Sequence, residues 1–361
     1  MEKFRFFVDP QWQRTGRHIP LMIPFWGNQY GDKAPFTRDL FNRFPFDTSL
    51  YCLVSDIREA DMILMPYNHN SLRTKYPDLL AEGKRLGKES GKLLVIESAI
   101  DIEHPAEEGA IMLRYGGYRF LPDPQAIQMP PYADDLLAWS GKKEITVREK
   151  SGKPSVGFAG WGSLPLLQSI RTVTKELPDR TRALFDKRYG ACKKGVFFRR
   201  QVLKVLQASN KVTCNFLIRS SYSGHAATAE KSLEELRAEF VENLEGSDYA
   251  LDVRGDPNVS VRLFESLSLG RIPLILDTER HFPFSDVLDY DTFSVRVDFR
   301  DLKKTSDILA AFHASLTPQK FVAMQHAARD AYVNYFRLDG ITKQLVRALR
   351  ERLARRNPAL S

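Results

Sequence analysis

The sequence predicts an α/β protein built from two domains of similar size. Short apolar segments alternate with longer helical segments, which is the pattern of parallel sheets covered by helices on both faces. A polar stretch closed by Gly and Pro, residues 140–154, divides this series in two and is the best linker candidate. The chain has 361 residues, a length that suits two domains of ordinary size.

The first half of the chain shows three candidate strands and one clear helix. The strands are short apolar runs at Pro20–Phe25, Ala60–Met65 and Leu93–Glu97. Pro77–Ser90 carries leucines among charged residues, which predicts a helix. The strand–helix–strand order favours a parallel sheet, in which we expect Leu93–Glu97 to be a central strand.

The second half repeats the alternation. The expected strands are Ser155–Ala159, Val212–Ile218, Tyr249–Val253, Ile272–Leu276 and Phe293–Val297. The expected helices are Leu233–Leu244 and Val261–Leu269. Two α/β domains joined in this way bind ligands in the crevice between them, at the carboxyl ends of the strands.

The end of the chain, Pro318–Arg356, is predicted to be mainly helical. Within it, residues 336–361 form a basic amphipathic helix whose apolar residues recur every four positions, at Ile341, Leu345, Leu349 and Leu353. We expect this helix to cross back and bury its apolar face on the protein itself. Contact with an anionic membrane is the alternative.

Positive charge is concentrated in the middle of the chain. The net charge is +8, and residues 151–240 hold 16 Lys and Arg against 7 Asp and Glu, whereas the flanking parts are balanced. Such a field suits a phosphate-bearing ligand, an anionic membrane or nucleic acid, and a solvated basic face is the alternative. No recognisable nucleic-acid-binding module accompanies it, so we expect no nucleic-acid partner.

Cysteine usage and hydropathy bear on the compartment. Cys52, Cys192 and Cys214 are too few and too scattered for a disulfide or zinc framework, and they fit a reducing environment. We see no secretory signal and no run of 18 apolar residues. These features predict a cytoplasmic protein, with peripheral attachment to the inner face of the membrane as an alternative.

The segment 247–297 contains the residues of a ligand site. A strand is followed by a loop with Arg254 and then by a helix that begins near Ser260. Helix N-termini bind phosphate through unpaired N–H groups and the positive end of the helix dipole. Arg262 in the first turn opposes that dipole, which favours an anionic partner, and Glu265 on the same face could accept hydrogen bonds from a ribose. The alternative is a local Arg–Glu surface pair.

These motifs resemble, in order, those of the exostosin-like glycosyltransferases. The matching residues are Val253-Arg254-Gly255, Ser260-Val261-Arg262-Leu263-Phe264-Glu265, Gly270-Arg271-Ile272-Pro273-Leu274-Ile275 and Phe282-Pro283-Phe284-Ser285-Asp286-Val287-Leu288-Asp289-Tyr290. Weaker matches upstream lie at Glu59–Pro66 and Ile127–Tyr132, so the resemblance covers roughly residues 60–297. The departures are mild: Tyr290, for example, stands where the family has Trp.

The resemblance implies a GT-B fold, in which two Rossmann-like domains face a cleft. Together with the linker it predicts an acceptor-side domain at 1–145, a nucleotide-sugar (donor) domain at 146–335 and the basic helix at 336–361. It also implies an inverting, metal-independent reaction without a cofactor. The expected donor is a UDP-sugar, with a GDP-sugar second, and the expected acceptor is a glycan or lipid-linked precursor in polysaccharide biosynthesis. A non-catalytic nucleotide- or glycan-binding protein is the alternative.

A metal-free reaction needs arginines and helix dipoles to neutralise the leaving diphosphate. The donor-binding candidates come from the basic middle segment, from the Gly-x-Gly turn after the first strand of the second domain, and from the matched motifs. They are Gly160, Arg199, Arg219, Arg254, Ser260, Val261, Arg262 and Glu265. We expect no metal site, because no clear Asp-x-Asp motif ends a strand and Asp134-Asp135 is expected to begin a helix.

Inversion also needs a general base for the acceptor hydroxyl, and this base is expected on a loop of the first domain. Asp101 and Glu97 are favoured, because both follow the expected central strand. His69 and Asp32 follow other candidate strands and are weaker choices. No base motif of the family matches here, so the choice rests on position alone.

Overall fold

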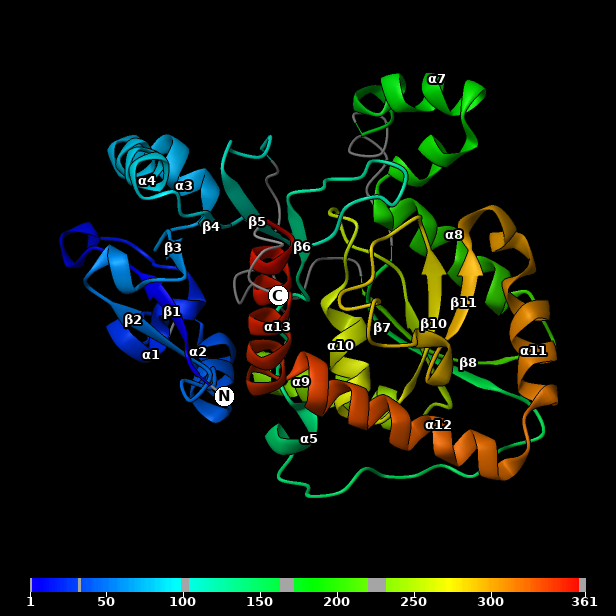
Figure 1. The fold of residues 1–361 in the computed structure, drawn as a ribbon. Helices are drawn as coiled ribbons and strands as arrows, with labels where there is room; N and C mark the ends of the chain where they lie inside the picture. Colours follow the sequence, from blue (N-terminus) through cyan, green and yellow to red (C-terminus); the bar gives the residue numbers. More distant parts are fainter. Residues whose placement is uncertain (1, 32–33, 99–103, 163–171, 220–231, 357–361) are drawn as a thin grey trace.

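Two parallel β-sheets, one in each half of the chain, organise the fold (Figure 1). The computed structural model describes residues 2–31, 34–98, 104–162, 172–219 and 232–356. The first sheet has six strands in the order β2-β1-β3-β4-β5-β6, and the second has five in the order β11-β10-β9-β7-β8. Neighbouring strands pair in parallel in both sheets, which confirms the α/β fold class with two Rossmann-like domains.

The first sheet confirms two of the three strands expected there. Its strands are β1 (Phe4–Phe7), β2 (Tyr51–Val54), β3 (Met62–Leu64), β4 (Leu94–Glu97), β5 (Ala110–Arg114) and β6 (Ala126–Gln128). The prediction of a strand at Pro20–Phe25 was wrong, because this segment forms a 3-10 turn, η2 (Pro20–Met22), and a short helix, α1 (Ile23–Trp26). Proline fits the first turn of a helix and cannot donate a hydrogen bond to a sheet, so the two prolines of this segment favour the helical turns.

Helices and turns flank the first sheet, and a short helix ends this half of the chain. They are η1 (Pro10–Trp12), α2 (Pro35–Arg43), η3 (Ile57–Glu59), α3 (His69–Thr74), α4 (Pro77–Ser90) and α5 (Leu136–Trp139). The predicted helix Pro77–Ser90 is confirmed as α4. It stops where Gly91 takes a left-handed conformation, with φ +69°, which ends helices at little cost.

The second sheet confirms all five strands expected in it. They are β7 (Ser155–Trp161), β8 (Thr213–Arg219), β9 (Tyr249–Asp252), β10 (Ile272–Asp277) and β11 (Val295–Asp298). The helices between them include the two predicted ones, now α9 (Leu233–Glu245) and α10 (Val261–Ser268). The other helices and turns are α7 (Leu177–Phe185), η4 (Lys187–Cys192), α8 (Gly195–Gln207), η6 (Tyr290–Thr292), η7 (Phe299–Lys304) and α11 (Thr305–Ser315).

The end of the chain returns to the first sheet. Helix α12 (Pro318–Ala331) leads through a π-helical turn, η8 (Tyr332–Phe336), into α13 (Leu338–Arg356). The apolar face of α13 is buried in one core with the strands of the first sheet, so this helix packs on its own protein. In Figure 1, α13 lies between the two halves. The same core contains Phe264 of α10 and Phe336, whose ring centroids are 4.8 Å apart, so it joins the two halves.

Among the described residues, no helix combines the length and the apolar character that are needed to cross a bilayer.

The packing of α13 predicts that shortening one of its buried side chains lowers the stability of the protein strongly. Leu349 is fully buried in the core that α13 shares with the first sheet. We expect Leu349→Ala to lower the free energy of unfolding by about 2–5 kcal/mol, through lost burial and the cavity left behind. Leu184, which is 80% exposed, offers the matched control: Leu184→Ala should change stability by less than about 0.5 kcal/mol. Urea denaturation measures both, and equal effects would contradict this packing.

Candidate active site

The carboxyl edges of the two sheets meet in space. The loop that follows β5 lies against the loops that follow β9 and β10. Asn258 Nδ2 donates a hydrogen bond to the carbonyl of Gly117 at 2.9 Å and another to the carbonyl of Thr278 at 3.0 Å. Gly116 has φ +95°, and a Cβ atom there would lie 3.2 Å from the backbone of Asn258. A side chain at Gly116 would therefore push the two edges apart.

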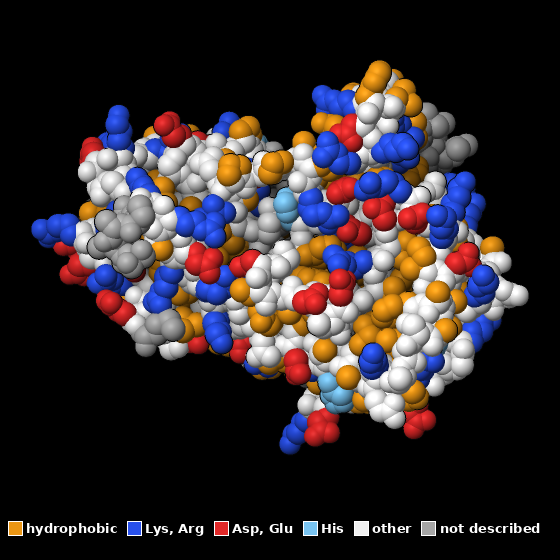
Figure 2. Space-filling view, turned by 45° about the vertical axis from the view of Figure 1, so that its right-hand side comes forward, with side chains coloured by type: hydrophobic (Ala, Val, Ile, Leu, Met, Phe, Trp, Pro, Cys, Tyr) orange, Lys and Arg blue, Asp and Glu red, His pale blue; other side chains and the backbone are white. Residues whose placement is uncertain are grey.

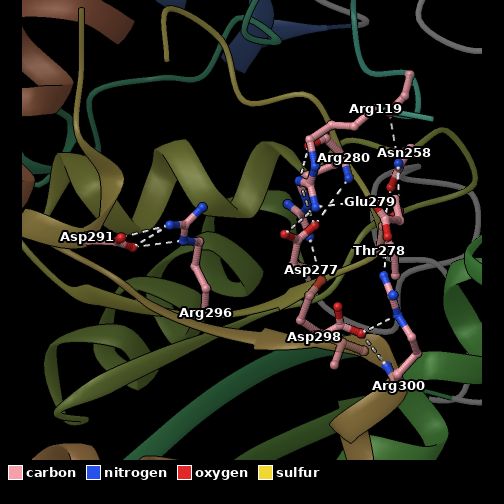
Figure 3. A network of polar contacts seen from close by, with 12 residues as sticks. Arg119, Asn258, Asp277, Thr278, Glu279, Arg280, Asp291, Arg296, Asp298 and Arg300 are labelled. Atoms are coloured by element: carbon pink, nitrogen blue, oxygen red, sulfur yellow. Dashed lines mark hydrogen bonds and ion pairs between the residues drawn. The ribbon is translucent and has the colours of Figure 1, made fainter. Parts of the chain in front are cut away.

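A network of polar contacts fixes this junction (Figure 3). Arg119, from the first domain, binds Asp277 at 3.0 and 3.2 Å and the carbonyl of Arg280 at 2.7 Å. Arg280 in turn forms an ion pair with Asp252 at 2.7 Å, and both side chains are almost completely buried. Asp252 and Asp277 end two neighbouring strands, so the network ties the first domain directly to the carboxyl edge of the second sheet.

A polar pocket of about 290 Å³ opens at this junction. Its polar lining comes from the ends of β5 and β6, from the loops beside them and from the second domain: His104, Arg114, Asp123, Gln128 and His281. Arg114 Nε donates to Asp123 at 2.6 Å, so these two charges neutralise each other. Burial, and then the nearby Arg119, lower the pKa of His281, which favours its neutral form. The pocket is therefore polar and close to neutral.

A second and more open hollow, of about 650 Å³, lies between α5 and α9. Its lining includes Glu242 and Glu245 and no Lys or Arg. It is close to Gly246, which precedes β9, so it lies at the amino edge of the second sheet. Glu245 is paired with Lys142 at 2.6 Å, and ligands of such folds bind at the opposite edge, so we do not assign the nucleotide to this hollow.

Gly160 and Arg262 are in direct contact at the carboxyl edge of the second sheet. The Arg262 guanidinium donates to the carbonyl of Ala159 at 2.8 Å and lies over the ring of Phe158, 4.6 Å from its centroid. Gly160 has φ +150°, and a Cβ atom there would lie 2.5 Å from Nη2 of Arg262. The predicted Gly-x-Gly turn thus makes room for an arginine of the first turn of α10.

Glu265 lies one turn further along α10, in a cluster of charges that spans both domains. Burial raises the pKa of Glu265, and the guanidinium groups of Arg237 and Arg262 partly oppose that rise. Arg237 binds Asp134 at 2.6 Å, and Asp134 also binds Arg43 of the first domain at 2.9 Å. The neighbouring Asp135 is the N-cap of α5, as the sequence suggested.

The start of α10 lies at the predicted position. Ser260 occupies the N-cap position, but its side chain makes no capping hydrogen bond. The helix thus begins where the sequence predicted, and the Ser260 hydroxyl does not bind the first-turn N–H groups. Val261, the first residue of the helix, is 40% exposed.

The remaining arginine candidates bind carbonyl and carboxylate groups of the protein itself. Arg254 is buried, donates to the carbonyls of Lys193 and Asp256, and lies over the ring of Tyr118. Arg199 donates to the carbonyl of Val253 at 3.3 Å. Arg219, at the end of β8, forms an ion pair with Glu239 at 2.9 Å. In this structure Arg254 and Arg199 shape the loop between β9 and α10, and Arg219 ties β8 to α9.

Glu97 ends β4, which is an interior strand as predicted, and the residue is 5% exposed. Burial raises its pKa to about 7, and the hydroxyls of Tyr115 and Tyr132 oppose part of that rise. Tyr132 donates to Glu97 Oε2 at 3.4 Å. A carboxylate with this pKa exchanges protons readily near neutral pH, as a general base must.

His69 lies in a separate buried network. Its Nε2 is 2.9 Å from Glu107, which Arg73 and Lys84 also bind. Burial lowers the pKa of His69. These contacts give His69 a structural partner inside the first domain. Asp101, the other favoured base, and Asp32 lie outside the described residues.

Sequence reasoning missed several residues of the junction. Asn258, Gln128, Tyr115, Tyr132 and His281 were not singled out. Gln128 is the last residue of a strand that the sequence did not reveal, and Tyr115 follows another. The sequence signal for this loop was the pair Gly116-Gly117 between Tyr115 and Tyr118, which is typical of a tight turn.

Two parallel sheets with a polar pocket between their carboxyl edges make the domain junction the candidate site. Residues 164–312 match the family model of the exostosin GT47 domain. This match agrees with the resemblance of the motifs to the exostosin-like glycosyltransferases and supports a glycosyltransferase activity.

Other comparisons add less. The search of curated proteins found no significant match. Among solved structures, the crystal structure of TarM is similar, with 10% sequence identity and a TM-score of 0.30 over 74% of this chain. The chain spans 57% of the length of that structure. Among the described residues, no group of three or more His, Cys, Asp or Glu side chains is placed to hold a metal ion.

The buried ion pair of the junction predicts a specific loss of stability. We expect Arg280→Met to lower the free energy of unfolding by about 3–5 kcal/mol, because it leaves Asp252 buried without its counter-charge. Replacing both residues, with Asp252→Leu added, should restore much of that loss.

The exposed pair of Arg296 and Asp291, in the same part of the fold, is the control. Arg296→Met should cost no more than about 1 kcal/mol. Guanidinium denaturation measures all three variants, and similar costs for the two arginine substitutions would contradict the assignment of Arg280 as the anchor of the junction.

Proposed function

We propose that the chain transfers a sugar from a nucleotide-sugar donor to a glycan or lipid-linked acceptor, with inversion and without a metal ion. One observation supports this most: Gly160 and Arg262 are in contact at the carboxyl edge of the second sheet, and Glu265 lies one turn further along α10. The loop residues Gly116 and Gly117 line that pocket and touch Asn258 and Val259, immediately before α10. Donor and acceptor sites would therefore be neighbours.

The donor diphosphate is assigned to the start of α10. The backbone N–H groups of its first turn have no helical partner, and the helix dipole adds a partial positive charge. Arg262 brings a full positive charge to the same turn, held between Gly160 and Phe158. Together these groups offset the negative charge of the leaving diphosphate, which is the part that a divalent cation plays in other transferases.

The ribose of the nucleotide is assigned to Glu265. This carboxylate lies on the same face of α10 as Arg262, one turn from the proposed phosphate position. A carboxylate accepts hydrogen bonds from both hydroxyls of a diol. The resemblance favours a UDP-sugar over a GDP-sugar.

The acceptor sugar is assigned to the pocket at the junction. Its opposite charges are paired within the protein, and Gln128 and His281 supply neutral donors and acceptors of hydrogen bonds. A neutral polar lining suits the hydroxyl groups of a sugar better than it suits an anion. The attacking hydroxyl belongs to this sugar.

Glu97 is the proposed base. As the acceptor oxygen attacks the anomeric carbon, its proton passes to the Glu97 carboxylate. The bond from that carbon to the diphosphate oxygen breaks on the opposite face, and the nucleoside diphosphate leaves with the electron pair. With a pKa of about 7, Glu97 is deprotonated in roughly half of the molecules at neutral pH.

The donor site predicts how one substitution changes nucleotide affinity. We expect Arg262→Ala to weaken UDP binding about tenfold to a hundredfold, the range for loss of a charge-assisted contact to phosphate. Arg200→Ala, an exposed arginine on α8, is the matched control and should leave the affinity unchanged. Isothermal titration with UDP and with GDP measures both variants.

Repeating the UDP titration in EDTA tests metal independence separately from the role of Arg262. Unchanged UDP affinity in EDTA is the expected result. Loss of binding in EDTA would contradict the metal-independent site, and equal affinity of Arg262→Ala and wild type would contradict the place of the diphosphate.

The assignment of Glu97 as the base predicts how the transfer rate depends on pH. The wild-type rate of nucleotide release from UDP-sugars, measured with an oligosaccharide panel as acceptors, should rise with pH and level off above about 7, because Glu97 must lose its proton first. Glu97→Gln should slow transfer about 10²–10⁴-fold and keep UDP affinity. Glu108→Gln, at an exposed site, is the control. An active Glu97→Gln enzyme would rule out this base, whereas UDP binding without turnover in wild type would indicate a non-catalytic binding protein.

A further inference from the structure

Helix α7 projects from the second domain (Figure 1), and none of its nine residues is buried. Yet it carries large apolar side chains: Leu177 is 58% exposed, Leu184 80% and Phe185 93%. Helices of globular proteins normally bury such residues as a stripe against the core. Here the apolar residues are presented to the outside.

The exposed apolar residues of α7 lie at its two ends, and two of the three share one face. Leu177 and Leu184 are seven positions apart, which places them on the same face of the helix, and Phe185 is its last residue. Figure 2 shows orange side chains at the tip of the projection that α7 forms and blue side chains on its flanks. The projection thus exposes a set of large apolar side chains, with Leu184 and Phe185 adjacent at one end, and not a single exposed residue, which would need no explanation.

The flanks of the tip are basic. Residues 172–194 contain seven Lys and Arg against three Asp and Glu, a net charge of +4. Lys175, Arg182, Lys187 and Arg188 are exposed. The excess positive charge in the middle of the chain is therefore displayed in part around α7.

We propose that α7 docks on an anionic lipid surface, with Leu177, Leu184 and Phe185 entering the boundary between headgroups and acyl chains. Apolar residues at a tip with Lys and Arg around them are the features by which peripheral helices bind such surfaces. The apolar residues supply burial, and the basic residues supply attraction to anionic headgroups. A helix that recognises a protein groove would instead present a longer apolar stripe with anchors at three- and four-residue spacing.

The position of α7 gives this docking a consequence for the proposed acceptor pocket. The turn η4, which follows α7, contacts the first-domain loop through Tyr189 and Phe120, whose ring centroids are 5.1 Å apart. The next residue of that loop, Leu121, lines the pocket and is 50% exposed. A membrane bound at α7 would therefore lie near the pocket entrance. The docking itself does not depend on the proposed reaction.

Co-sedimentation of the full chain with vesicles tests the proposal. We expect binding to vesicles of phosphatidylcholine mixed with phosphatidylglycerol, weaker binding to phosphatidylcholine alone, and weakening by added salt. The double variant Leu184→Ser/Phe185→Ser should bind at least about tenfold more weakly, because two apolar side chains no longer enter the bilayer. Val287→Ser, at another exposed apolar residue that is 44% exposed, is the matched control and should bind as wild type does.

Three results would overturn the proposal: no binding of wild type to either vesicle, equal binding of wild type and the double variant, or equal binding to both lipid compositions. Sedimentation velocity without lipid tests the remaining explanation, which is that α7 binds a second copy of the chain. If the double variant abolishes self-association and leaves vesicle binding unchanged, α7 is an interface between copies of the chain and not a membrane contact. UDP affinity, measured in parallel, reports on the donor site separately, so failure of one proposal does not obscure the other.

Discussion

The close approach of the two carboxyl edges is the constraint on which the rest of the structure depends. Asn258 bridges Gly117 and Thr278, and Arg119 reaches across to the end of β10. The buried pair of Asp252 and Arg280 fixes the loop that receives these contacts. Together with the shared core around α13, these contacts hold the second-domain wall of the pocket against the first domain.

A second constraint sets the position of the one arginine that the proposed reaction needs most. Arg262 is held against Gly160, at a point where any larger residue would meet its guanidinium. Its helix also belongs to the core that α13 completes, so the donor edge and the end of the chain are mechanically linked. Charges that span the domains, from Arg43 through Asp134 to Arg237, lead to the neighbourhood of Glu265. Such a chain connects the arrangement of the domains to the electrostatics of the donor site.

The sequence predicted the second sheet far better than the first, for physical reasons. Strands of the second sheet are apolar runs bounded by Gly, Pro and charged turns, so local pattern was sufficient. β6 has only three residues, and it is defined by its pairing with β5. β1 carries an arginine among its phenylalanines. Neither strand therefore has a clear signal in the local sequence. Arg262 and Glu265 were proposed because an ordered motif surrounds them, and Glu97 because its strand was recognised. Gln128 and His281 were not, since only tertiary contacts bring them together.

A crystal structure with bound UDP tests the central claim most directly, because it locates the donor site relative to the domain junction. We predict the diphosphate at the N-terminus of α10, within hydrogen-bond distance of Arg262, and the ribose beside Glu265. UDP bound in the acidic hollow between α5 and α9, or bound without contact to α10, would contradict the assignment of the cleft as the site of transfer.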